Sequence, residues 1–526
     1  MARLVWCRSI RSAQVAFIAL LAARASAASP EECAALASPP FPPDATALST
    51  TWMPADAATS TPEHCRVEGN IGPGTIGFAL QLPTAWNRKL YHQGGGGFVG
   101  AIPDAIAGLR LGYATAATDT GHRGNVLDAS WALDNPQARV DFGYRAVHVT
   151  TTTAKALLAS YYGSGPSRSY FVGCSRGGGQ GLMEAQRFPE DFDGLVVAAP
   201  AFDWTEFMVG FNWNSRAVSA NPIPLAKLTV IENAVLQNCD AEDGVVDGLV
   251  QDPRRCSFDP ASLLCTSGDG PDCLTAGQVA AVRAVYSGPH NSAGERITHG
   301  FPSGAEGPVG GWEAWISGDG WTRGMPSPPL QYLFQDGFLR YFVYNDPSYD
   351  PFTFDYDQGP ATLAQTSLLT DATDPDLTAL KARGGKIVMW HGWNDHALSA
   401  LKTISYYHQV IDTLRGNAGH GERDRSELPR ALANTTDFIR LFLAPGMHHC
   451  GGGPGMTTFD AFGALVNWVE NGIAPDRLVA TGASKPGVSR PLCPYPLQPV
   501  YKGGDVNSAD SFACELRGAD PRRGKR

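Results

Sequence analysis

Apolar residues recur with strand and helix spacing along the chain from about Ile71 to Asp203. Residues 142–161 place Val147, Ala154, Leu157 and Leu158 on one helical face, and residues 181–187 begin a second helix. Short apolar runs that we expect to be strands lie at 75–81, 89–92, 113–118, 169–172 and 194–199. Strands that alternate with helices of this length predict an α/β fold, with a mostly parallel sheet covered on both faces.

This alternation stops at about Asp203 and returns at about residue 375. Residues 204–374 are rich in Gly, Pro, Trp and Cys and show no sustained period, so we expect a lid inserted into the core. The core pattern resumes with strands at 386–390 and 438–443 and with a closing helix at 459–470. We therefore expect a catalytic domain made of residues 28–203 and 375–526, interrupted by a lid domain at 204–374.

The N-terminal residues have the layout of a secretory signal. Arg3, Arg8 and Arg11 precede an apolar run at 13–23, and a small-residue cleavage site, Ala-Ser-Ala, ends at Ala27. The run is too short to span a bilayer and no other run is long enough, so we expect residues 1–27 to be removed and the mature chain to be secreted or periplasmic. A buried N-terminal helix is the alternative, and the basic flank disfavours it.

The charge of the remaining chain argues against two classes of partner. Removing the four arginines of the signal from the 41 basic residues leaves 37 against 51 acidic residues, a net charge of −14. A chain this acidic is repelled by phosphate backbones and anionic lipid, so we expect neither nucleic acid nor membrane as a partner. The charge says little about a small substrate, and the sequence leaves the oligomeric state open.

Ten cysteines remain after Cys7 is removed with the signal. An even number in an exported chain predicts disulfides, and the absence of a C-x-x-C spacing disfavours zinc. The C-terminal segment that holds Cys493 and Cys514 is expected to lie on the core as a stapled tail.

A candidate nucleophile lies between the strand at 169–172 and the following helix. Gly173-Cys174-Ser175-Arg176-Gly177 fits the G-x-S-x-G motif, in which the glycines allow a strained turn that lifts the serine Oγ above the sheet. The motif alone is weak, and a glycine-rich turn without catalysis is the alternative. Its position between strand and helix favours a nucleophile at Ser175.

A serine hydroxyl needs a base, and the base needs an acid to orient it. Asp395 follows the strand at 386–390, and His449 follows the strand at 438–443, which gives the order Ser, acid, His of this type of hydrolase. The neighbouring histidines, His391 and His448, are interpreted as hydrogen-bonding residues of these loops. We therefore expect a Ser175–His449–Asp395 triad.

Cysteines adjoin both ends of this candidate triad, Cys174 beside Ser175 and Cys450 beside His449. A disulfide between them would hold the nucleophile close to the base and would close a very long loop, worth about 5 kcal/mol in the chain-entropy model. Two unrelated structural cysteines are the weaker alternative.

Cys-Ser, Asp and His-Cys in this order resemble the tannase and feruloyl esterase family, which also contains the hydrolase of mono(2-hydroxyethyl) terephthalate, and the resemblance runs from about Cys33 to Cys514. It implies an α/β-hydrolase core with a large lid, the triad above and the Cys174–Cys450 bridge. It also implies four further bridges, namely Cys33–Cys65, Cys239–Cys256, Cys265–Cys273 and Cys493–Cys514. The spacing alone does not fix this connectivity.

Two further sites are expected. The oxyanion of a tetrahedral intermediate needs backbone donors, for which we select Arg176 and either Gly95 or Gly96 in the glycine run after residues 89–92.

A metal site is expected in the acidic run that follows Cys239. Asp240, Asp243 and Asp247, with the carbonyls of Val245 and Leu249, can surround a hard cation, although an acidic surface turn is equally consistent with the residues. The resemblance implies structural calcium there, and no organic cofactor.

The lid is rich in aromatic residues, most of which we expect to form its core, while a few line a slot for a planar acyl group. The favoured hypothesis is hydrolysis of feruloyl- or galloyl-type esters through an acyl-enzyme. A terephthalate-monoester hydrolase, a general carboxylesterase or acyltransferase, and a calcium-dependent extracellular binding protein on an inactive hydrolase core are the alternatives. Arg323 is a weak candidate for binding a substrate carboxylate, and the sequence does not identify the ester.

Overall fold

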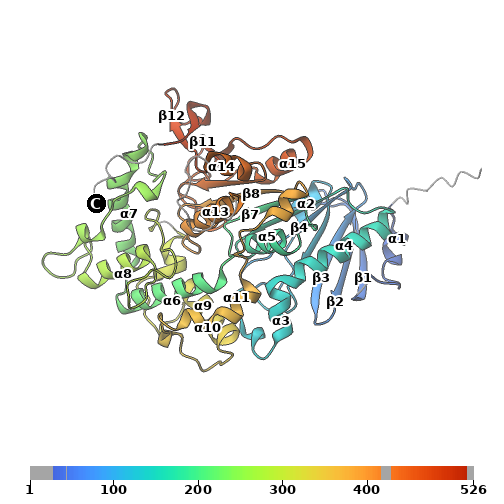
Figure 1. Cartoon of the computed structure of the whole chain (residues 1–526), viewed down its shortest axis with the longest axis horizontal. Coiled ribbons are helices and arrows are strands. Elements are labelled where there is room, and N and C mark those ends of the chain that lie inside the picture. The colour runs from blue at the N-terminus through green and yellow to red at the C-terminus, as the bar shows by residue number, and fades with distance from the viewer. Residues whose placement is uncertain (1–27, 43, 308, 416–427, 518–526) are drawn as a thin grey trace, which may run out of the picture.

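A nine-stranded sheet forms the centre of the computed structural model, which describes residues 28–42, 44–307, 309–415 and 428–517 (Figure 1). The strand order is β1-β2-β3-β5-β4-β6-β7-β8-β9. Strands β4 to β9 pair in parallel, whereas β1, β2 and β3 are antiparallel and β3 meets β5 antiparallel. The bounds are β1 Ala45–Met53, β2 His64–Ile71, β3 Ile76–Pro83, β4 Lys89–Gln93, β5 Ala114–Thr118, β6 Arg168–Cys174, β7 Gly194–Ala198, β8 Lys386–Gly392 and β9 Ile439–Ala444.

Helices cover both faces of this sheet because successive strand residues point to opposite sides. On β6, Tyr170 packs with α15 (Ala461–Asn471) and Phe171 packs with α5 (Arg176–Arg187) and α13 (Ala400–Leu414). Helix α4 (Ala146–Tyr162) lies on the α5 side. The shorter helices of this part are α1 Pro30–Ala35, α2 Ile106–Arg110, α3 Pro136–Val140, α12 Thr378–Ala382 and α14 Leu428–Thr436. The α/β fold with a mostly parallel sheet is thus confirmed.

Residues 204–374 connect β7 to β8 and lie beside the sheet, in green and yellow in Figure 1. They contain more regular helix than their composition predicted. The helices are α6 Trp204–Ala220, α7 Leu225–Cys239, α8 Ala276–Ser287, α9 Leu330–Gly337, α10 Gly359–Thr362 and α11 Ala364–Thr370. The apolar faces of α6, α7, α8 and α9 pack into one cluster that also includes Phe98, Phe142 and Leu398 from outside the segment. The division into a catalytic domain and a lid domain stays a prediction.

Several elements differ from the sequence expectations at their ends. The helix expected from residue 181 begins at Arg176, directly after the candidate nucleophile, and the helix expected from residue 142 opens with one π-helical turn at Asp141–Arg145. Strands β1 and β2 were not predicted. After α15 the chain forms two small antiparallel pairs, β10 (Leu478–Thr481) with β11 (Ser489–Leu492) and β12 (Gln498–Tyr501) with β13 (Phe512–Glu515).

Five disulfides join the pairs that the resemblance implied, Cys33–Cys65, Cys174–Cys450, Cys239–Cys256, Cys265–Cys273 and Cys493–Cys514. The last links β13 to the turn after β11. Within the described ranges, no helix is both long enough and apolar enough to cross a bilayer. The expected signal segment, residues 1–27, lies outside the described residues.

Candidate active site

Ser175 lies at the junction of β6 and α5, with a backbone conformation that side-chain-bearing residues rarely adopt (φ +60°, ψ −123°). The amide of Ser175 donates to Ala198 O (3.1 Å), and its carbonyl accepts from the Ala201 amide (2.8 Å). A Cβ atom on Gly173 would collide with the backbone of Gly177, so the first and last glycines of the motif allow the tight turn. The strained turn places Ser175 at the carboxyl end of the parallel strands, as G-x-S-x-G predicts.

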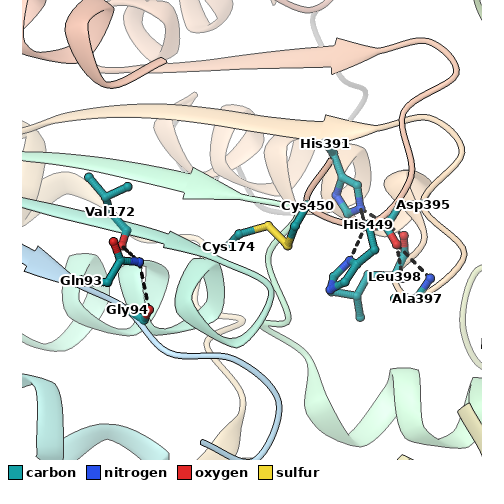
Figure 2. Close-up of a disulfide and its surroundings, with 10 residues drawn as sticks. All are labelled: Gln93, Gly94, Val172, Cys174, His391, Asp395, Ala397, Leu398, His449 and Cys450. Atoms are coloured by element: carbon teal, nitrogen blue, oxygen red, sulfur yellow. Dashed lines mark hydrogen bonds and ion pairs between the residues drawn. A yellow bond between two sulfur atoms is a disulfide. The ribbon is translucent and has the colours of Figure 1, made fainter. Parts of the chain in front are cut away.

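Asp395 lies in the turn after β8 and is fully buried. Its Oδ1 accepts from the amides of Ala397 (2.8 Å) and Leu398 (2.9 Å), and its Oδ2 lies 2.8 Å from Nδ1 of His449 (Figure 2). Burial alone would raise the pKa of this carboxyl, but the imidazoles of His449 and His391 outweigh burial and hold its pKa well below the ordinary value. The ionised carboxylate assigns the proton of His449 to Nδ1, which leaves Nε2 able to accept one.

His391 contacts the candidate acid Asp395, whereas the sequence suggested only a hydrogen-bonding residue of the loop. Its Nε2 lies 3.2 Å from Oδ2 of Asp395 and 3.0 Å from the carbonyl oxygen of Leu398, and its Nδ1 lies 2.9 Å from Oγ1 of Thr403. The sequence signal was its position four residues before Asp395, at the end of a core strand. His448 is buried beside His396, with 5.6 Å between ring centroids.

The Cys174–Cys450 disulfide spans the gap between the Ser175 turn and the His449 loop (Figure 2). Its Cα atoms are 5.9 Å apart although the two cysteines are 276 positions apart in the sequence. Since Cys174 precedes Ser175 and Cys450 follows His449, the bond ties together the two loops that carry the candidate nucleophile and base.

Ser175 and His449 line the same cleft. The indole of Trp315 meets the ring of His449 edge-on, with 5.0 Å between centroids. The other lining residues are mostly apolar, namely Gly97, Ala201, Trp204, Phe207, Phe211, Phe334, Ala397 and Leu398. Arg323, the candidate for a substrate carboxylate, is instead bonded to Asp350 (2.6 Å). The side chains beside Ser175 and His449 are therefore mainly apolar and aromatic.

The residues selected for the oxyanion come from the start of α5 and from the glycine run after β4. Arg176 starts α5, and its guanidinium is buried against the carbonyls of Phe142 and Gly143, where burial lowers its pKa to about 9. The Gly95 amide donates to Oε1 of Gln180 on α5 (3.0 Å), which directs it toward the helix. A Cβ on Gly96 would meet no atom within 4 Å, so space is open there.

The acidic run after Cys239 forms a turn in which backbone amides already bind two of the carboxylates. Asp240 accepts from the amides of Asp247 (3.1 Å) and Gly248 (2.9 Å), and Asp243 accepts from the amide of Val245 (2.9 Å). Leu249 is buried at the end of the turn.

The charges of this turn fit a cation in one respect and oppose it in another. Burial, then the nearby carboxylates of Asp247 and Asp240, raise the pKa of Asp243, and a bound cation would relieve that repulsion. Asp247, however, already pairs with Arg490 (2.7 Å). In the described part of the chain, the side chains that come within mutual reach of one ion are His148, Glu184 and Asp191 rather than these three aspartates.

Comparison with known proteins supports the family resemblance of the sequence and the α/β fold. Residues 61–515 match the family model described as tannase and feruloyl esterase. The chain is 36% identical to an uncharacterized esterase of Xanthomonas campestris, over 98% of this chain and 96% of that protein. It is 34% identical to the mono(2-hydroxyethyl) terephthalate hydrolase of Piscinibacter sakaiensis, over 88% and 87%. The crystal structure of feruloyl esterase B from Aspergillus oryzae superposes with a TM-score of 0.80 at 27% identity, covering 92% of this chain and 99% of that one.

Proposed function

The chain belongs to the tannase and feruloyl esterase family and is a carboxylic ester hydrolase, and we propose that it cleaves esters of aromatic carboxylic acids with a Ser175–His449–Asp395 triad. One observation carries this proposal. A strained Ser175 and a His449 bonded to an ionised Asp395 line one aromatic cleft.

In the proposed reaction, Nε2 of His449 takes the proton of Ser175 while Oγ attacks the ester carbonyl carbon. The tetrahedral oxyanion is held by the amides of Arg176 and Gly96. We favour Gly96 over Gly95 because the Gly95 amide is bonded to Gln180. His449 then protonates the leaving alkoxide, an acyl-enzyme forms, and water activated by His449 releases the acid and restores the serine hydroxyl.

The cleft favours an uncharged aromatic acyl group. Trp204, Phe207, Phe211, Trp315 and Phe334 offer faces and edges to a planar ring, and no lysine or arginine of the described ranges lines the cleft. A carboxylate buried there would lack an ion-pair partner, which is costly. Feruloyl-type esters therefore fit the cleft better than a terephthalate monoester.

Dimethyl and monomethyl terephthalate test this preference because they differ only in whether the group opposite the scissile ester is neutral or anionic. We expect kcat/KM for the neutral diester to exceed that for the monoanion by about a hundredfold, well beyond its twofold statistical advantage. Methyl ferulate, methyl gallate and p-nitrophenyl butyrate complete the panel. Faster turnover of the monoanion would identify a terephthalate-monoester hydrolase, and a clear preference for the butyrate would identify a general carboxylesterase.

Labelling with a fluorophosphonate tests the nucleophile independently of the substrate. Intact mass should show one adduct on the wild-type protein and none on S175A. An unlabelled wild-type protein would favour a binding protein on an inactive hydrolase core instead.

We further propose that the protein is exported and carries structural calcium. The five disulfides support an oxidising destination. At the turn after Cys239, Asp240, Asp243 and Asp247 would hold calcium with the carbonyls of Val245 and Leu249, and Asp247 would exchange Arg490 for the ion. Calcium there would add stability only, so no step of the reaction depends on it.

A further inference from the structure

The carboxylate of Asp395 is shared between two imidazoles. Nδ1 of His449 and Nε2 of His391 lie 2.8 Å and 3.2 Å from the same oxygen, Oδ2. Figure 2 shows the three side chains together. His391 lies near the end of β8 and pairs with Leu443 of β9, so the sheet fixes its backbone. Both His391 and Asp395 are fully buried. The His391 ring therefore faces the triad from a rigid element.

The proton on His391 can be placed from its neighbours. Its Nε2 faces two acceptors, Oδ2 of Asp395 and the carbonyl oxygen of Leu398 at 3.0 Å, so this nitrogen must be a donor. Its Nδ1, 2.9 Å from Oγ1 of Thr403, can then accept the threonine hydroxyl proton. The bonds to Thr403 and to the Leu398 carbonyl hold the ring so that Nε2 stays 3.2 Å from Oδ2 of Asp395.

Two other histidines act electrostatically on Asp395, His396 and His448. Burial lowers the pKa of His396 to about 3, and burial also lowers the pKa of His448. Both are neutral near pH 7. The groups that set the hydrogen bonding of Oδ2 are therefore His391 and His449.

We propose that His391 is a positioning residue of the triad, which holds Oδ2 of Asp395 toward His449 and moderates its pull on the His449 proton. The proposal rests on the proposed function, since it requires His449 to be the base. A carboxylate oxygen that accepts a second hydrogen bond has less negative charge to offer the first. A variant of His391 without a donor would therefore leave Oδ2 a stronger acceptor for the Nδ1 proton of His449.

Two amide substitutions separate this role from simple packing. In H391Q the side-chain nitrogen can reach the position of Nε2 and donate to Oδ2, whereas in H391N the amide is one methylene shorter and cannot. We expect H391Q to keep kcat within about threefold and H391N to lose about tenfold to a hundredfold, with KM for p-nitrophenyl butyrate nearly unchanged in both. The acid limb of the kcat/KM profile should move to higher pH in H391N by about half a unit or more, and not in H391Q.

His408→Gln is a matched control, because its Nε2 bonds to Tyr495 (2.9 Å) instead of to the triad. Circular dichroism and thermal unfolding establish that each variant is folded, and if H391N is not, H391M keeps the length of glutamine without its donor. A folded H391N or H391M with wild-type kcat and acid limb would overturn the proposal. So would equal losses in H391Q and H391N. A wild-type protein that a fluorophosphonate does not label would instead overturn the proposed function, and this role with it.

Discussion

Removing the Cys174–Cys450 disulfide should cost more stability than removing any short-range disulfide of this chain. In the chain-entropy model the loss of unfolding free energy grows with 1.5RT ln n, where n is the number of residues in the loop that the disulfide closes. A separation of 276 residues gives a loss of about 5.6 kcal/mol for C174A/C450A. The Cys265–Cys273 bond, with a separation of 8, gives about 2.5 kcal/mol for C265A/C273A. The second variant is the control, and the expected difference in unfolding free energy is about 3 kcal/mol.

The two variants should also differ in activity. Cys174 and Cys450 adjoin Ser175 and His449, and a displacement of about 1 Å between reacting groups can cost about a hundredfold in rate. We expect kcat of folded C174A/C450A to fall by at least about tenfold, and kcat of C265A/C273A to stay near that of the wild type.

Urea unfolding followed by tryptophan fluorescence measures the first quantity, and hydrolysis of p-nitrophenyl butyrate without urea measures the second. Equal midpoints and m values for the two variants would refute the loop-length argument. A folded C174A/C450A with wild-type kcat would refute the claim that the bond aligns the triad.

Three further predictions concern single side chains. S175A should lose at least about a thousandfold in kcat, and D395N should lose about 10⁴-fold with the fold intact, both measured by ester hydrolysis; smaller losses would exclude a triad. Burial, then the charge of Glu306, raise the pKa of Glu232 to about 7, so the folded state binds this proton more tightly than the unfolded state. The free energy of unfolding should therefore fall as the pH rises from about 4 to 7. Urea unfolding at pH 5 and pH 8 measures this fall, which should be smaller in E232Q than in the wild type. An equal fall in E232Q would contradict the prediction. Chelation should lower the melting temperature, and calcium should restore it in the wild type but not in D243N; a melting temperature indifferent to chelator would remove calcium from the proposal.

The parallel part of the sheet was predictable because its strands are short apolar runs buried on both faces. Strands β4 to β9 fall where those runs were found. The antiparallel strand β2 carries polar residues such as Arg66, Glu68 and Asn70, and β1 is rich in serine and threonine, so both strands lacked that signal. The lid helices α6 and α7 were missed for a related reason. On α6 the polar residues Asn212 and Asn214 are buried and bonded to glutamines of α9, and on α7 Lys227 is buried and bonded to Gln278, which blurs the helical period.

The sequence by itself determined the candidate chemistry and its order along the chain. A nucleophile turn needs small residues at fixed spacing, and an acid or base at a strand end follows a readable apolar run, so Ser175, Asp395 and His449 could be selected from local patterns. The cysteine pairing came from family resemblance, because spacing does not encode connectivity.

Only the tertiary structure decided what surrounds those groups. That His391 shares Oδ2 of Asp395, that Gly95 is bonded to Gln180, and that Arg323 pairs with Asp350 all depend on contacts between segments or across a turn. Hydrogen bonds have angstrom tolerances, while a sequence pattern places a residue only on an element or in a loop. The identity of the candidate reacting groups is therefore local information, whereas their protonation, their orientation and the cleft around them are set by packing of distant segments.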